Sequence, residues 1–283
     1  MATPGITSER PGTTATYLDH IVAHHRRRAA ADPRSLDAVI EAALAESATS
    51  PPRGFRSALV AAPGNHARVH VIAEVKRRSP SKGIIRPHLD PGVLAGAYQL
   101  GGASCVSVLT DEPHFGGSAA DLVAARTAIT IPVLRKDFTV DARDVADARA
   151  MGADCCLLIA AVLDDEALEA CLSVARAVGI DALVEVHDEA EAARAMASGA
   201  DLIGVNQRDL VTFAVDTERA IRVAQSLPTS VVRVAESGVE HVDAAARLAN
   251  AGYHAILVGE ALVRSDDPAG LVQALAMAKE SRA

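Results

Sequence analysis

The chain contains very few aromatic residues: they make up 2 % of its 283 residues, and tryptophan is absent. Hydrophobic residues still reach 49 %, so the core must be built mainly from Val, Leu, Ile and Ala. This composition is typical of a buried parallel sheet covered by alanine-rich helices. The length allows one large domain or two small ones.

Sequence signals of several other protein classes are absent. The net charge of −8 argues against a nucleic-acid partner, which would require a basic face. No apolar run approaches the ~20 residues that span a membrane. The polar start of the chain lacks the apolar core of a signal peptide. We therefore expect a cytoplasmic protein that binds neither a membrane nor nucleic acid.

The cysteines and histidines do not indicate a metal site. The four cysteines form no C-x-x-C pair and lie in apolar stretches, which predicts small buried side chains in a reducing compartment. No H-E-x-x-H motif and no Cys/His cluster with ligand spacing is present, so we expect no metal. We expect His24 and His25 on an exposed helix face. His187 is expected to be solvated or to lie at a helix entry rather than to act in catalysis.

A weak internal repeat of about 50 residues organises the chain. Four segments begin with a glycine that can end a helix, and an apolar strand follows each glycine. These segments start at Gly101, Gly152, Gly199 and Gly252. Further strands are predicted at 69–75, 131–135, 181–186 and 230–235. Together they give about eight strands, one every ~25 residues, with a helical pattern in each gap.

Strands and helices that alternate in this way predict a parallel sheet, and about eight units predict a closed (β/α)8 TIM barrel. Clear helices are expected at 164–178 and 188–198. An open, doubly wound sheet is the rival fold. It would carry a G-x-G-x-x-G loop after the first strand, and none is present. We expect a flexible tail over 1–16 and one barrel domain over 17–283. That domain includes an N-terminal helical extension within 17–48, with helices at 17–31 and 36–47.

Polar side chains follow the predicted strands at the point where each strand ends. Because side chains alternate along a strand, Glu74 and Lys76 point to the same side, as do Asn206 and Arg208. The carboxyl ends of barrel strands meet at one mouth, where the chemistry of such folds takes place. Acids and lysines gathered in a narrow mouth favour proton transfer. The acids are Glu74, Glu185 and Glu236, and the lysines are Lys76 and Lys136.

A phosphate site is predicted independently at the loops after the last two strands. Barrels often hold a phosphate there, and these loops carry Ser237, Gly238 and Gly259. Glycine lets backbone N–H groups approach an anion closely. The alternative interpretation is that the glycines only permit tight turns.

The ordered set of motifs resembles the indole-3-glycerol-phosphate synthase family of tryptophan biosynthesis. The matching stretches are 72–83, 134–138, 182–187, 203–210, 234–238 and 257–260. The likeness runs from about residue 17 to the end, and His114 replaces a common aromatic residue. The family closes the ring of 1-(2-carboxyphenylamino)-1-deoxyribulose 5-phosphate to indole-3-glycerol phosphate, as a carboxy-lyase without cofactor or metal. The resemblance thus implies a small phosphorylated substrate. We expect a monomer or a weak homo-oligomer.

The resemblance also implies residue roles. Lys136 would be the general acid of ring closure, and Lys76 would bind the carboxylate or act as acid in dehydration. Glu185 and Glu74 would be the bases, and Glu236 would lie near the reacting centre. Asn206 would fix the substrate near its hydroxyls, and Arg208 would support that geometry. The residues implied at the phosphate or glycerol end are Ser79, Ser237, Gly238, Gly259 and Glu260. The apolar wall for the aromatic ring would be Phe138, Leu157 and Leu210.

Two other functions compete with this one. A phosphoribosylanthranilate isomerase would need a Cys/Asp acid–base pair at its rim, and the predicted rim contains no cysteine. A non-catalytic barrel that binds a sugar phosphate would be expected to lose the Lys/Glu set, yet every member is present.

Overall fold

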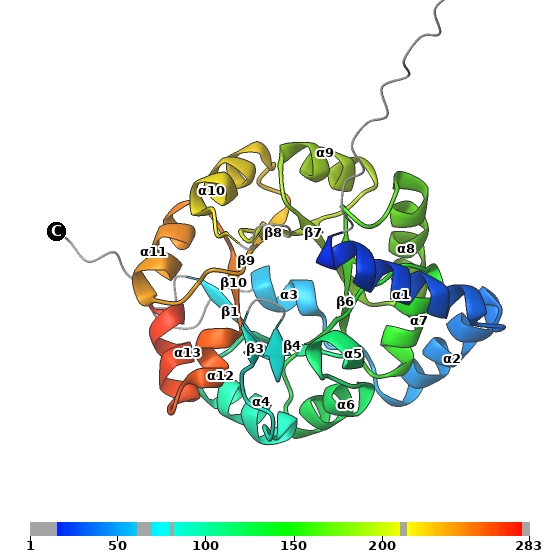
Figure 1. The fold of residues 1–283 in the computed structure, drawn as a ribbon, viewed down its shortest axis with the longest axis horizontal. Helices are drawn as coiled ribbons and strands as arrows, with labels where there is room; N and C mark the ends of the chain where they lie inside the picture. The colour runs from blue at the N-terminus through cyan, green and yellow to red at the C-terminus, as the bar shows by residue number, and fades with distance from the viewer. Residues whose placement is uncertain (1–15, 61–68, 80–81, 210–213, 279–283) are drawn as a thin grey trace, which may run out of the picture.

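A closed barrel of eight parallel strands forms the centre of the molecule (Figure 1). The computed structural model describes residues 16–60, 69–79, 82–209 and 214–278. The strands are β1 (His70–Val75), β4 (Cys105–Leu109), β5 (Val133–Lys136), β6 (Cys155–Ile159), β7 (Asp181–Val186), β8 (Leu202–Asn206), β9 (Val232–Glu236) and β10 (Ala255–Val258). They follow one another around the barrel in chain order, and β1 pairs with β10 to close it. The predicted (β/α)8 fold is confirmed.

Helices surround the barrel as an outer layer (Figure 1). They are α4 (Pro91–Leu100), α6 (Ala119–Ala128), α7 (Ala142–Ala150), α8 (Asp165–Val178), α9 (Glu189–Ala197), α10 (Thr217–Ser226), α11 (Val242–Asn250) and α13 (Pro268–Ala276). The two helices that the sequence predicts most clearly form as α8 and α9. The Asp164 and Asp188 side chains cap their N-termini, and Gly179 ends α8 in the left-handed conformation.

Alternation along the strands explains how polar groups reach the mouth. Inward-facing side chains in the lower part of the barrel are apolar and form one packed cluster. Two residues further along a strand, the same inward face reaches the C-terminal end and becomes polar. The successive pairs are Ile72 and Glu74, Leu134 and Lys136, Leu183 and Glu185, and Val234 and Glu236. Apolar side chains therefore fill the interior of the barrel, and polar side chains line the cavity at the C-terminal ends of the strands.

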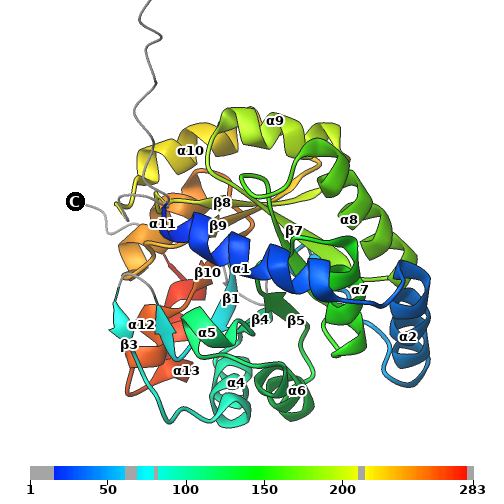
Figure 2. The ribbon, with the colours of Figure 1, turned by 45° about the vertical axis from the view of Figure 1, so that its right-hand side comes forward.

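The N-terminal extension consists of α1 (Tyr17–Ala31) and α2 (Leu36–Thr49), close to the predicted bounds. Helix α1 lies across the barrel, as Figures 1 and 2 show from two directions. Helix α2 packs against α7. Of the predicted flexible tail, all but the last residue lies outside the described part of the chain.

Short elements that the sequence did not predict complete the fold. They are α3 (Phe55–Val60), α5 (Glu112–Phe115), α12 (Glu260–Arg264) and the antiparallel pair β2 (Arg78–Ser79) and β3 (Gly83–Ile84). Phe55 and Leu59 of α3 join the apolar cluster inside the barrel. The Arg56 backbone N–H donates to the Asp181 carboxylate at the start of β7, 2.9 Å away. Helix α3 therefore closes the end of the barrel opposite the mouth.

Two expectations from composition can be compared with the structure. All four cysteines are buried, as predicted, and none is in a disulfide. Within the described ranges, no helix is both long enough and apolar enough to cross a membrane.

Candidate active site

One cavity at the barrel mouth brings together the predicted site residues. Fourteen of the fifteen line it: Glu74, Lys76, Ser79, Lys136, Phe138, Leu157, Glu185, Asn206, Arg208, Glu236, Ser237, Gly238, Gly259 and Glu260. Leu210 lies outside the described residues. The sequence missed the contribution of α1, whose Tyr17, Leu18 and Ile21 also line the cavity. The sequence predicts this helix but not its position over the mouth.

Lys136 lies between two carboxylates that line the cavity with it. Its Nζ is 3.2 Å from Glu185 Oε2 and 3.4 Å from Glu236 Oε2. Burial opposes the charge of Lys136, but Glu185, Glu236 and Glu74 outweigh it and raise the pKa of this ammonium. Lys136 is therefore protonated at neutral pH, which is the form that a general acid requires.

The two carboxylates beside Lys136 differ in protonation. Burial raises the pKa of Glu236 to about 8, although Lys136 acts in the opposite direction. Burial also disfavours charge on Glu185, but Lys136, His187 and Asn206 outweigh it and lower the pKa of Glu185. Glu185 is thus the ionised member of the pair and the better base, while Glu236 is substantially protonated at neutral pH.

Hydrogen bonds fix the polar groups around this centre. Asn206 Nδ2 donates to Glu185 Oε1 at 3.0 Å, and the Arg208 backbone N–H donates to Asn206 Oδ1 at 3.0 Å. On the neighbouring part of the mouth, Lys76 Nζ forms an ion pair with Glu74 Oε1. The spacing of two residues in Glu74–Lys76 therefore brings both side chains into the cavity, as predicted.

Two glycines leave room for the carboxylates. A Cβ atom on Gly204 in β8 would lie 2.0 Å from Glu236 Oε1. A Cβ atom on Gly259 would lie 2.3 Å from Glu74 Oε1 and 2.9 Å from Lys76 Nζ. Gly259 was predicted for phosphate binding, whereas Gly204 was not predicted as a site residue.

The loops that follow β1 and β9 carry residues predicted for phosphate binding. Ser237 and Gly238 both adopt the left-handed backbone conformation, with φ angles of 65° and 70°. The Ser79 hydroxyl is buried at the cavity and has no hydrogen-bond partner among the described residues. An anion can bind here, because the side chains are small and the Ser79 hydroxyl is available to donate a hydrogen bond.

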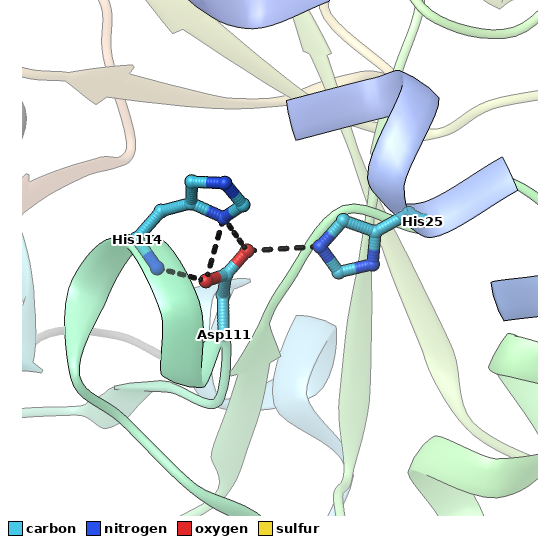
Figure 3. A group of neighbouring side chains, drawn as sticks. All are labelled: His25, Asp111 and His114. Carbon is cyan, nitrogen blue, oxygen red and sulfur yellow. Dashed lines mark hydrogen bonds and ion pairs between the residues drawn. The ribbon is translucent and has the colours of Figure 1, made fainter. Parts of the chain in front are cut away.

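His25 is buried, contrary to the prediction of an exposed helix face. It is 2 % exposed, and its Nε2 lies 2.8 Å from Asp111 Oδ2 (Figure 3). His114 Nδ1 approaches the same oxygen at 2.9 Å. The prediction was wrong because the pattern of α1 does not reveal that this helix lies across the mouth. Burial opposes ionisation of Asp111, but hydrogen bonds from His25 and His114 outweigh it and lower its pKa to about 2.

In the described part of the chain, His25, Asp111 and His114 form the one group of metal-ligand type, with ligand atoms within 4.8 Å of one another. Each imidazole lies at hydrogen-bonding distance from the carboxylate, so hydrogen bonds account for the arrangement. The cluster connects α1 to the segment that follows β4.

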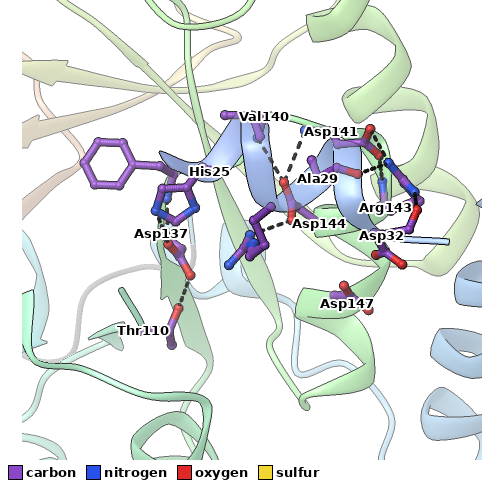
Figure 4. Close-up of polar contacts among 12 residues, drawn as sticks. His25, Ala29, Asp32, Thr110, Asp137, Val140, Asp141, Arg143, Asp144 and Asp147 are labelled. Carbon is purple, nitrogen blue, oxygen red and sulfur yellow. Dashed lines mark hydrogen bonds and ion pairs between the residues drawn. The ribbon is translucent and has the colours of Figure 1, made fainter. Parts of the chain in front are cut away.

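Further polar contacts dock the extension beside the segment that follows Lys136 (Figure 4). Arg28 Nη2 donates to Asp144 Oδ1 at 2.9 Å, and Arg143 donates to the carbonyls of Ala29 at 2.8 Å and Asp32 at 2.9 Å. These contacts join α1 to α7. They hold α1 where its residues line the cavity.

His187 is not solvated: its side chain is 13 % exposed. Its backbone N–H donates to Glu191 Oε2 at 2.8 Å, so the predicted role at a helix entry is confirmed. The ring lies between two carboxylates, with Nδ1 3.0 Å from Glu191 Oε2 and Nε2 3.6 Å from Glu185 Oε1.

Comparisons with known proteins agree with this geometry. The family model for indole-3-glycerol phosphate synthase matches residues 18–275. The chain is 47 % identical over 264 residues to the indole-3-glycerol phosphate synthase of Mycobacterium ulcerans, covering 93 % of this chain and 95 % of that protein. It is 53 % identical over 203 residues to the protein of the same description from Nocardioides sp., covering 72 % of this chain and 78 % of that protein.

Solved structures resemble the chain in fold alone. The N-acetylmannosamine-6-phosphate 2-epimerase of Clostridium perfringens aligns with a TM-score of 0.55 at 13 % identity, covering 69 % of this chain and 88 % of the other. The thiamine phosphate pyrophosphorylase of Pyrococcus furiosus aligns with a TM-score of 0.54 at 17 % identity, covering 74 % of this chain and 95 % of the other.

Proposed function

The chain belongs to the indole-3-glycerol phosphate synthase family, and on that premise we propose that its cavity closes the indole ring. The substrate would be 1-(2-carboxyphenylamino)-1-deoxyribulose 5-phosphate. A carbon of the aryl ring attacks the ketone, CO₂ is lost, and water leaves to give indole-3-glycerol phosphate. The protein would thus act as a carboxy-lyase.

The acid steps are assigned to the two lysines. Lys136 protonates the ketone oxygen as the new carbon–carbon bond forms, because its ammonium lines the cavity and is protonated at neutral pH. Lys76 holds the carboxylate that will leave as CO₂, or acts as the acid that helps the new hydroxyl to leave as water. The ion pair of Lys76 with Glu74 fixes its ammonium at the mouth.

The base steps are assigned to Glu185 and Glu74. Loss of CO₂ restores the benzene ring, and loss of a proton from the new five-membered ring after water has left completes the aromatic indole. Glu185 is suited to accept that proton because its pKa is lowered. Asn206 orients Glu185 and can contact a substrate hydroxyl. Glu236, with its raised pKa, lies next to Lys136 and so near the reacting centre.

The two ends of the substrate differ in chemistry, and so do the two sides of the cavity. Phe138 and Leu157, together with Leu18 and Ile21 of α1, supply apolar surface for the aromatic ring. The phosphate and glycerol end is assigned to Ser79, Ser237, Gly238, Gly259 and Glu260, and Arg208 supports the geometry of Asn206. Glu260 would offer its backbone N–H rather than its carboxylate.

A single observation supports this proposal most strongly. Lys136, Glu185 and Glu236 come from three strands and line one cavity with an apolar wall. The Lys136 ammonium lies 3.2 Å from the Glu185 carboxylate and 3.4 Å from that of Glu236. This is an acid and a base preorganised around one reacting position. The isomerase alternative is not supported, because no cysteine lines the cavity among the described residues.

The proposal is tested by incubating the purified protein with 1-(2-carboxyphenylamino)-1-deoxyribulose 5-phosphate. We expect the fluorescence of indole-3-glycerol phosphate to appear together with one equivalent of CO₂. Binding without turnover would support a non-catalytic barrel, and turnover of phosphoribosylanthranilate instead would support the isomerase. The cytoplasmic location and the monomeric or weakly oligomeric state stay predictions.

A further inference from the structure

We infer that His187 is a positioning residue for catalysis: its protonated imidazole keeps the base Glu185 ionised. The inference rests on the proposed function, because it specifies how the base of that reaction is maintained. The supporting observation is the location of the ring, which lies between the carboxylates of Glu185 and of Glu191 on α9.

The ring is oriented by contacts on one side. Both the Nδ1 atom and the backbone N–H of His187 lie within 3.0 Å of Glu191 Oε2. This double contact leaves Nε2 directed toward Glu185 Oε1 at 3.6 Å. Nε2 is buried and has no hydrogen-bond partner among the described residues. When the ring is protonated, the carboxylate that faces Nε2 is that of Glu185.

Helix entry alone does not require an imidazole at this position. The backbone N–H of His187 already donates to Glu191, and the Asp188 side chain caps α9 by accepting from the Glu191 backbone N–H at 2.8 Å. Any residue with a backbone N–H could make the first contact. The imidazole adds two features to that backbone contact: its Nδ1 also bonds to Glu191, and its Nε2 lies 3.6 Å from Glu185 Oε1.

The charges around the pair favour the protonated ring. Burial disfavours charge on His187, but Glu191 and Glu185 outweigh it and raise its pKa above the ordinary value, with Arg219 acting in the opposite direction. Around Glu185, Lys136 and His187 both favour the carboxylate, and Asn206 donates to it.

Glu236 opposes ionisation of Glu185 only when it is itself ionised, because the two carboxylates then repel each other. Lys136 must serve as an acid and can share its charge between both carboxylates. A second cation that approaches Glu185 but not the substrate keeps the base ionised while Lys136 donates its proton. His187 is absent from the lining of the cavity, which suits this indirect role.

The first experiment compares pH profiles of the full chain and the His187→Gln variant. Glutamine keeps the backbone donor and a polar side chain but cannot carry the charge. We expect the acid limb of kcat to move to higher pH by about one unit, since an opposite charge at this distance shifts a carboxyl pKa by that order. The two profiles should meet at alkaline pH, where Glu185 is ionised in both proteins.

Substrate ionisation affects both proteins equally, so the difference between the profiles reports on the enzyme. His88→Gln, at an exposed histidine, is the matched control and should leave the profile unchanged. An acid limb at the same pH in His187→Gln and in the unsubstituted chain, with both proteins folded, would overturn the inference. Absence of ring closure by the unsubstituted chain would instead refute the proposed function.

The second experiment does not depend on activity. NMR titration of the His187 ring should give a pKa above the ordinary histidine value, and Glu185→Gln should lower it by about one unit, because coupling between two sites is reciprocal. The same His187 pKa in both proteins would show that the two groups do not interact, whatever the enzyme catalyses.

Discussion

Two glycines in the barrel wall set how closely the catalytic groups can pack. Gly204 faces the barrel interior between Leu202 and Asn206, and the Glu236 carboxylate occupies the space that a larger residue would fill. Glu236 lines the cavity, so a Cβ atom at position 204 would force its carboxylate to shift. The position of the Glu236 carboxylate therefore depends on the absence of a side chain at Gly204 on the neighbouring strand.

Gly204→Ala should displace Glu236 from Lys136 and reduce kcat by roughly 10²-fold, as expected when a catalytic group moves by about 1 Å. Steady-state kinetics with the ring-open substrate measures the effect. Gly96→Ala is the matched control, because Gly96 lies in α4 and a Cβ there meets no atom within 4 Å. Equal kcat in both variants would mean that the position of Glu236 does not matter for catalysis.

The sequence predicts the inward-facing catalytic residues because strand alternation is a local rule. Glu74 and Lys76 are the clearest case, since a spacing of two determines their common side. The sequence does not predict Gly204, because its role depends on the distance to Glu236 on an adjacent strand. The sequence also does not predict the location of the His187 ring, because its contact with Glu191 depends on how the chain enters α9.

At the scale of elements, α1 is part of the active site as well as an extension. Its bounds follow from its sequence, with Thr16 and Asp19 forming a capping box at its start. Its location does not follow, because docking depends on Asp111 and Arg143, which are far away in the sequence. The burial of His25 was mispredicted for this reason.

His25→Ala should loosen α1 from the barrel. It removes a buried hydrogen bond to a charged group, so we expect a loss of roughly 1.5–3 kcal/mol in the free energy of unfolding. KM should also rise several-fold, because Tyr17, Leu18 and Ile21 of α1 line the cavity. Denaturant unfolding and steady-state kinetics measure the two effects.

Arg27→Ala on the exposed side of the same helix provides the control and should change neither quantity. If His25→Ala behaved like this control, the contact between His25 and Asp111 would not hold α1 in place.

At the scale of the whole molecule, the fold was predictable because a repeat of about 50 residues, eight strand signals and glycine helix ends all agree. The short closing elements were not predictable in the same way. Helix α3 is only six residues long, so it is stabilised mainly by the packing of Phe55 inside the barrel rather than by its own backbone hydrogen bonds. The site residues come together because the barrel closes, and closure is predicted from the repeat along the whole chain rather than from any one segment.

Removal of metal ions should leave the activity of the whole protein unchanged, because the proposed proton transfers are assigned to side chains of the chain. The measurement is turnover after dialysis against a chelator, compared with turnover after readdition of Zn²⁺ or Mg²⁺. A loss that metal restores would contradict the proposed mechanism. It would also direct attention to His25, Asp111 and His114 as ligands.

The most direct test of the central claim is the turnover of Lys136→Ala with the ring-open substrate. Lys136 is the shared partner of Glu185 and Glu236 in the cavity, so we predict a folded protein whose kcat is lower by orders of magnitude. Circular dichroism and the unfolding midpoint establish that the variant is folded. Turnover near that of the unsubstituted chain would contradict the assignment of Lys136 as the acid that closes the ring.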